Sequence, residues 1–195
     1  MRLRVKWSFL FGLLLSLAVG WLVFPLALYE TIEQPLQFSH KAHTGESAGM
    51  SCEDCHSFRE DGSFSGIPRV ENCAGCHSEP QGDSKAESIL VDKYVSAERE
   101  IPWLVYSRQP DNVHFSHVQH VKSAEIPCER CHGPHGHSDR ARPFQRNRIS
   151  GYSRDIWGQS ISGIARAEWD GMKMDDCVAC HAERGVVDSC LLCHK

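Results

Sequence analysis

Cys128-Glu-Arg-Cys-His132 is one of five copies of a C-x-x-C-H pattern in a chain of 195 residues. The other copies begin at Cys52, Cys73, Cys177 and Cys190, and together the five copies use all ten cysteines. Because no cysteine lies outside these copies, the cysteines do not indicate a framework of structural disulfide bonds. C-x-x-C-H is the sequence signature of covalent attachment of a c-type haem.

In each copy, the two thiols predict two thioether bonds to one haem, and the histidine that follows predicts the proximal ligand of its iron. The sequence therefore predicts five covalently bound haems c. The attachment residues are Cys52, Cys55, Cys73, Cys76, Cys128, Cys131, Cys177, Cys180, Cys190 and Cys193, and the proximal ligands are His56, His77, His132, His181 and His194. A zinc array is the alternative, but it gives no reason for a histidine directly after every second cysteine.

The remaining histidines predict the second ligands of the irons. Phe38-Ser-His-Lys-Ala-His43 precedes the first motif and Phe115-Ser-His-Val-Gln-His120 precedes the third, so an F-S-H-x-x-H unit occurs twice. Histidines three positions apart on a helical turn point the same way but are offset along it, so each unit is expected to serve two neighbouring haems. The predicted distal ligands are His40, His43, His117 and His120, followed by His137 and then His135.

Three other residues bear on this ligand set. His114 is the histidine that the scheme leaves spare. Met172 and Met174 precede Cys177 and are rivals for the fourth iron, whose potential a methionine ligand would raise.

Length and composition limit the fold. A chain of this size that carries five haems can bury only a small core of its own, so we predict that the haems form the core. The expected fold is a multihaem cytochrome c with mostly short α-helices and loops wrapped around haems. With 41% hydrophobic residues the chain is not a disordered tail, and a net charge of −4 argues against general nucleic-acid binding.

The N-terminus predicts a membrane anchor. Arg2, Arg4 and Lys6 precede a run from Trp7 to Tyr29 that has no charged side chain and is long enough for a transmembrane helix. The positive-inside rule then keeps the N-terminus in the cytoplasm and places the haem-binding part in the periplasm, outside the inner membrane. The alternative is a signal peptide cleaved at Ala18-Val-Gly20, but the apolar run exceeds the usual signal core.

The motifs divide the chain into five parts: a transmembrane anchor (1–29), a tether (30–36), a two-haem unit (37–80), a connector with a short helix (81–112) and a three-haem unit (113–195). In the connector, Ser84-Lys-Ala-Glu87 has the pattern of a capping box and predicts a helix to about Glu98 that Pro102 ends.

Two further features of the sequence carry expectations. Trp103 and Tyr106 are expected to pack on haem faces. The arginine-rich stretch 138–176 is either a solvated loop or a segment that pairs with haem propionates or a partner subunit.

Four segments carry a resemblance to known proteins: Phe38–Gly45, Ile101-Pro-Trp-Leu-Val105, Asp111–Val121 and Cys128–Pro134. The F-S-H-x-x-H and C-x-x-C-H combination resembles the class III, low-potential multihaem cytochromes c. With the I-P-W segment between the same two haem motifs, the chain is similar to the membrane-anchored multihaem subunit of alternative complex III and its menaquinone reductase relatives.

The resemblance implies a place in a larger complex. Its partners would be polysulfide-reductase-type membrane subunits that hold the quinol site, an iron–sulfur protein and another cytochrome c. In that setting the chain would relay electrons from quinol oxidation to a periplasmic acceptor, and it would have no catalytic residues of its own.

Two alternatives to this function are of other kinds. Small anchored tetrahaem quinol dehydrogenases also have one N-terminal helix, but they oxidise quinol themselves. A haem enzyme that converts nitrite or hydroxylamine would need a five-coordinate iron, whereas two axial ligands per iron leave no open position.

Overall fold

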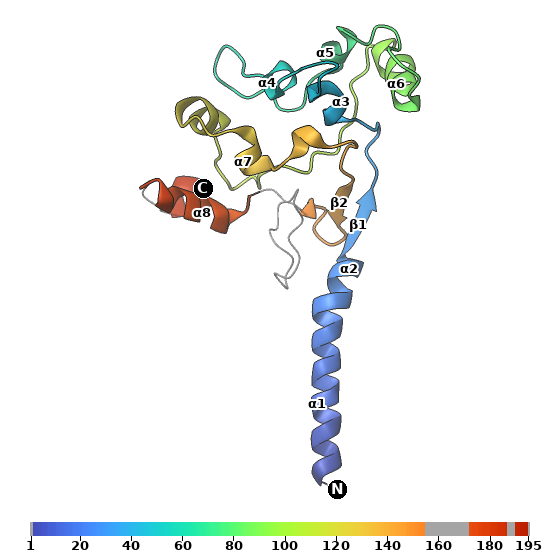
Figure 1. Ribbon diagram of the computed structural model, residues 1–195. Helices are drawn as coiled ribbons and strands as arrows, with labels where there is room; N and C mark the ends of the chain where they lie inside the picture. Colours follow the sequence, from blue (N-terminus) through green and yellow to red (C-terminus); the bar gives the residue numbers. More distant parts are fainter. Residues whose placement is uncertain (1, 155–171, 187–189, 195) are drawn as a thin grey trace.

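A computed structural model describes residues 2–154, 172–186 and 190–194. A long N-terminal helix projects from a head of short helices and loops (Figure 1). It comprises α1 (Arg2–Ala18), a π-helical turn (Val19–Val23) and α2 (Phe24–Leu28). The stretch Lys6–Val23 has a mean hydropathy of 1.7 and none of it is buried, so it is long and apolar enough to cross a membrane. A signal sequence has the same properties, and the anchor therefore stays a prediction.

A two-stranded ribbon joins this helix to the head. β1 (Tyr29–Ile32) pairs antiparallel with β2 (Phe144–Asn147). Glu30 on β1 forms ion pairs with Arg146 and Arg148, so two cations of the arginine-rich stretch contact the start of the head. The predicted tether at 30–36 is thus in part a β-strand, which the sequence pattern did not reveal.

Short helices carry the sequence motifs, as predicted. The C-x-x-C-H copies lie on α4 (Cys52–Cys55), α5 (Val70–Ala74), α7 (Cys128–His132), α8 (Met174–Glu183) and α9 (Cys190–Cys193), and the F-S-H-x-x-H units form α3 (His40–Thr44) and a π-helical segment (Val118–Ser123). Local capping explains where two of them begin. The Ser39 hydroxyl accepts a hydrogen bond from Ala42 N at the start of α3, and Ser51 and Asp54 form a capping box on α4.

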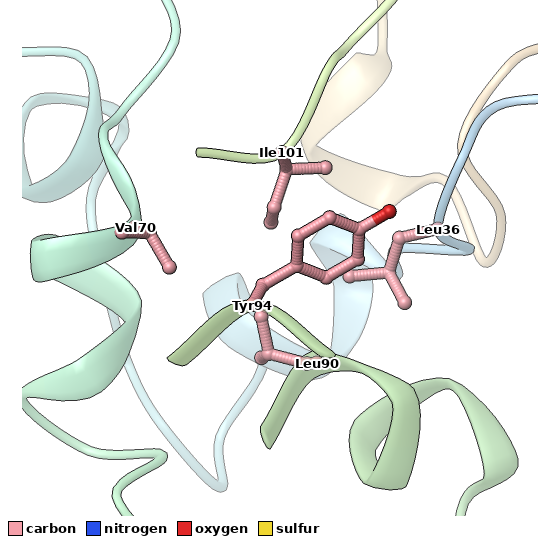
Figure 2. Packing of buried hydrophobic residues seen from close by; sticks show 5 residues of the cluster. All are labelled: Leu36, Val70, Leu90, Tyr94 and Ile101. Carbon is pink, nitrogen blue, oxygen red and sulfur yellow. The ribbon is translucent and has the colours of Figure 1, made fainter. Parts of the chain in front are cut away.

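The connector forms α6 (Lys85–Leu90), which continues as a π-helical turn (Val91–Val95). It ends before the predicted Glu98 because that residue has φ 46°, a left-handed conformation that no α-helix continues through. Leu90 and Tyr94 pack with Leu36, Val70 and Ile101 in a small hydrophobic cluster (Figure 2). Trp103 and Cys73 pack against this cluster, so the cluster fixes the second haem motif. The expectation that Trp103 packs on a haem face stays a prediction.

The side chain of Tyr94 is 1% exposed and fills the centre of this cluster. Tyr94→Ala is expected to lower the free energy of unfolding by about 3–5 kcal/mol, the usual cost of truncating a buried large aromatic side chain. Denaturant unfolding of the haem-loaded protein measures the loss. Tyr152→Ala is the matched control, because Tyr152 is 48% exposed. Equal losses in the two variants would contradict a central role for Tyr94.

Candidate haem-binding sites

Three imidazole pairs lie at matching distances. The ring centroids are 6.1 Å apart for His43 and His77, 6.3 Å for His117 and His132, and 6.1 Å for His120 and His181. In each pair, a histidine of an F-S-H-x-x-H unit faces the histidine of a C-x-x-C-H motif. These separations lie near the long end of the range in which aromatic rings interact directly.

The separations fit one metal ion held between the two rings. With metal–nitrogen bonds of about 2.0–2.1 Å and about 1.1 Å from Nε2 to the ring centre, two imidazoles on opposite sides of an iron have centres about 6.2–6.4 Å apart. The rings are nearly parallel in two pairs, at 1° and 16°, and are inclined by 54° in the third. Rotation about the metal–nitrogen axis allows any of these angles, so all three pairs fit.

The other ring nitrogen of several imidazoles is held by the protein. Nδ1 lies 2.8 Å from the Ser39 carbonyl oxygen in His43, from the Ser116 carbonyl oxygen in His120 and from the Gly66 carbonyl oxygen in His56. An Nδ1–H that donates to a carbonyl oxygen fixes the tautomer and leaves Nε2 free to bind iron. The hydrogen bonds therefore orient these side chains as ligands.

His77 has a different partner. Its Nδ1 lies 2.8 Å from Glu87 Oε1, and the same oxygen accepts a hydrogen bond from Gln81 N at 2.6 Å. Ser84 Oγ accepts from Glu87 N, so one half of the predicted capping box is present, while the carboxylate bonds to His77 and Gln81. The Gln81 backbone N–H lowers the pKa of Glu87 most, and the hydrogen bond to His77 lowers it further.

His40, His135 and His137 lie in one region, where α3 contacts a 3₁₀ turn (His135–His137). Burial, together with neighbouring histidines, lowers the pKa of His40 to about 4, and burial lowers that of His135 to about 4. Both are therefore neutral at pH 7, as iron ligands must be. His137 differs, because its side chain is 77% exposed and lies 3.8 Å from a Glu129 carboxylate oxygen. The geometry thus favours His135 over His137, the reverse of the order expected from the sequence.

His56 and His114 are placed by other contacts. The charge of His56 lowers the pKa of His40 after burial and His135, so these two histidines of the first haem unit are neighbours. His114 N donates to the Cys193 carbonyl oxygen at 2.7 Å, and Val113 forms a β-bridge with His194. His114, the histidine to which the sequence assigned no iron, therefore lies beside the fifth motif.

The rival ligands and the aromatic residues are also placed. Met172 N donates to the Cys131 carbonyl oxygen, whereas the Met174 side chain is exposed. The Tyr106 ring lies 5.7 Å from the His135 ring and 5.1 Å from the Arg142 guanidinium. Tyr106 therefore packs beside a candidate ligand. Residues 155–171, which belong to the arginine-rich stretch, lie outside the described residues.

All ten cysteines lie in the described ranges, none of them forms a disulfide bond, and cysteines of different motifs interact electrostatically. Burial raises the pKa of several of these thiols most, and a thiol of another motif raises it further. The interacting thiols are Cys55 and Cys76, Cys73 and Cys55, Cys128 and Cys52, Cys131 and Cys180, and Cys177 and Cys193. These electrostatic interactions link the motifs in the order second, first, third, fourth and fifth.

Several site residues were missed by the sequence reasoning. Phe38 stacks on His43 at 4.4 Å, and Phe115 stacks on His120 at 4.6 Å. Their presence in both F-S-H-x-x-H units was the signal for this role. Phe64, which stacks on His117 at 4.2 Å, has no such signal, because it approaches from a loop far away in the sequence.

C-x-x-C-H motifs, three of whose histidines lie 6.1–6.3 Å from a second imidazole, are the residues that would hold covalently attached haems in a multihaem cytochrome c. The class III cytochrome c family model matches residues 25–101. Over 202 aligned residues the chain is 41% identical to the multihaem cytochrome c subunit of menaquinone reductase from Nitratidesulfovibrio vulgaris, and the alignment covers 96% of this chain and 89% of that protein. The chain therefore belongs to the family of this multihaem cytochrome c, in which haem c is covalently bound.

Proposed function

We propose that the chain is a pentahaem c-type cytochrome that relays electrons between a membrane complex that converts quinol and quinone and a carrier in the periplasm. The observation that carries this proposal is the set of three imidazole pairs at trans-ligand spacing. An iron bound on both sides by imidazole has no open position for a substrate and supplies one-electron transfer. This chemistry supports an electron-transfer subunit rather than an enzyme.

The pairs also assign ligands. In this proposal, His43 serves the iron of His77, His117 that of His132, and His120 that of His181. In the second F-S-H-x-x-H unit, the first histidine therefore serves the next motif and the second histidine serves the motif after that. The same rule gives His40 to the iron of His56. The iron of His194 then takes a remaining imidazole, from His135, His137 or His114.

The electrostatic interactions between cysteines of different motifs support a single row of haems. The motifs follow one another in the order second, first, third, fourth and fifth. In Figure 1, α5 of the second motif lies at the end of the head far from α1, α7 lies lower, and α8 lies below α7 at the left edge of the head.

We further propose an inner-membrane location, with the apolar helix as a single anchor and the head in the periplasm. The relative's name supports membrane subunits as partners, because menaquinone is a membrane quinone. We propose polysulfide-reductase-type subunits, an iron–sulfur protein and a second cytochrome c. The sequence resemblance implies outward flow from quinol, whereas the relative is named for reduction of the quinone, so the potentials of the haems decide the direction in this chain.

Mass spectrometry and EPR of the protein purified from native membranes under mild detergent test this function. The expected result is five covalently attached haems, low-spin iron signals and co-purified membrane subunits. A missing haem or a free thiol at any motif would contradict the pentahaem proposal. A high-spin signal in the intact protein would instead favour an enzyme with an open iron position.

His120→Ala tests the ligand assignment. Removing this imidazole is expected to convert one iron, that of His181, from low spin to high spin, because its sixth position is then open or bound by water. EPR and absorption spectra of the purified protein measure the change. Gln119→Ala in the same turn is the control and should keep every iron low-spin. An unchanged spectrum for His120→Ala would contradict the assignment of His120 to the iron of His181.

A further inference from the structure

One imidazole among the candidate ligands is bonded to a negative charge. Of the five histidines His40, His43, His56, His77 and His120, four place Nδ1 beside a neutral oxygen, which is a backbone carbonyl or, for His40, the Ser138 hydroxyl. His77 places it 2.8 Å from the carboxylate of Glu87. The side chains of His77 and Glu87 are only 21% and 12% exposed.

The carboxylate is held in place by its surroundings. Glu87 lies in the first turn of α6, where Ser84 Oγ accepts from its backbone N–H at 3.1 Å. Gln81 N donates to the same Oε1 that faces His77. A Cβ added to Gly82 would be 3.4 Å from Glu87 Oε2, so the backbone passes close to the carboxylate.

The other end of α6 is fixed by the hydrophobic cluster. Leu90 is buried in that cluster, and Cys73 of the second motif packs against it. The same packing therefore holds the helix that carries Glu87 and the helix that carries the haem-attaching cysteine. The hydrogen bond between Glu87 and His77 therefore connects α6 and the second motif, which the hydrophobic cluster already holds together.

A carboxylate that accepts the Nδ1–H of a ligand imidazole makes that imidazole a stronger donor to its metal. Stronger donation, together with a nearby negative charge, stabilises the higher oxidation state of the iron and lowers its reduction potential. A neutral carbonyl or hydroxyl oxygen at the same place has a smaller effect, because hydrogen bonds to charged groups are about twice as strong.

We propose that Glu87 is a positioning residue that acts through His77 to lower the reduction potential of the haem attached at Cys73 and Cys76. This inference rests on the proposed haem ligation and goes beyond it. That haem occupies the far end of the row. A lower potential there favours electron flow away from this end of the row.

Glu87→Gln is the decisive variant, because the amide oxygen can still accept from His77 and Gln81 while the charge is lost. Potentiometric titration of the holoprotein, followed by optical and EPR spectra, is expected to show one haem that is at least tenfold easier to reduce, which is about 59 mV for a one-electron couple. The other four haems should keep their potentials, and all irons should stay low-spin. The shifted step is identified by its loss in a Cys73→Ala/Cys76→Ala protein.

Glu71→Gln is the matched control. Glu71 lies on α5, the same helix as Cys73, but its side chain is 73% exposed and pairs with Arg69. This variant removes the same charge without touching His77, so no tenfold shift is expected. If Glu87→Gln moves no potential further than Glu71→Gln does, the proposal is overturned.

Glu87→Asp separates this role from a purely structural one. It keeps the carboxylate, so the potential should return toward that of the native protein. Loss of the haem in both Glu87→Gln and Glu87→Asp would show that Glu87 serves folding alone, and would overturn the proposal. Absence of a haem at Cys73 and Cys76 in the native protein, seen by mass spectrometry, would instead count against the proposed function.

Discussion

Replacing both Cys128 and Cys131 by alanine is expected to divide the row of haems into two separate halves. The electrostatic interactions between cysteines support an order of the motifs in which the third is the middle member. The second and first motifs lie on one side of it, and the fourth and fifth lie on the other. The variant should carry one haem fewer by mass. Electron transfer across the gap should slow by at least about a hundredfold, equivalent to about 2.7 kcal/mol of activation free energy.

Stopped-flow absorbance of the complex from native membranes measures this effect, with a reduced water-soluble menaquinol analogue as the electron donor. Only half of the remaining haem absorbance should change in the fast phase, whichever end receives the electrons. Cys190→Ala/Cys193→Ala is the control, since it removes a terminal member and leaves the other four haems contiguous. A single fast phase of full amplitude in the Cys128→Ala/Cys131→Ala complex would refute the proposed order.

The chain produced without haem attachment is expected not to fold in its head. Among the described residues, the buried hydrophobic side chains are few: Leu36, Val70, Leu90, Val91, Tyr94, Ile101 and Ile126. They cannot offset the conformational entropy lost on ordering the head, which is about 1–2 kcal/mol for each backbone residue. Covalently held haems supply the missing burial, so their binding energy is also folding energy.

The measurement compares protein made in cells with and without the haem-attachment machinery. Limited proteolysis and hydrogen exchange should show a protected head only when haem is attached. The protein with all haems attached is the control, and should unfold cooperatively in denaturant. A haem-free chain with equal protection of the head would contradict the view that the haems form its core.

The parts of the site that depend on local sequence were predictable. A C-x-x-C-H copy contains both thiols and the proximal histidine within five residues, and the sequence alone placed all five on short segments. The two F-S-H-x-x-H units were recognised because one of them repeats the other. The pairing of His117 with His132 and of His120 with His181 agrees with the expectation that one unit faces two haems, and their ligation remains a prediction.

The parts that depend on distant contacts were not predictable. The pattern Ser84-Lys-Ala-Glu87 is typical of a capping box, and nothing local shows that the carboxylate bonds to His77 instead. Tyr29 was predicted as the end of the anchor and 30–32 as the start of the tether, and nothing local shows that these residues form a strand with Phe144–Asn147. The high exposure of the His137 side chain is likewise a property of the folded chain that the motif does not show, and the choice between His135 and His137 as a ligand remains a prediction.

The β1–β2 ribbon determines how the apolar helix is attached to the head. Arg148 N donates to the Leu28 carbonyl oxygen, directly where the apolar helix ends, and Glu30 is paired with Arg146 one step further on. β1 starts and β2 ends beside the last helical turn, so the helix is joined to the head through paired strands rather than through a single extended segment. A neighbouring subunit that bound the helix would therefore also orient the head and the haems attached to it.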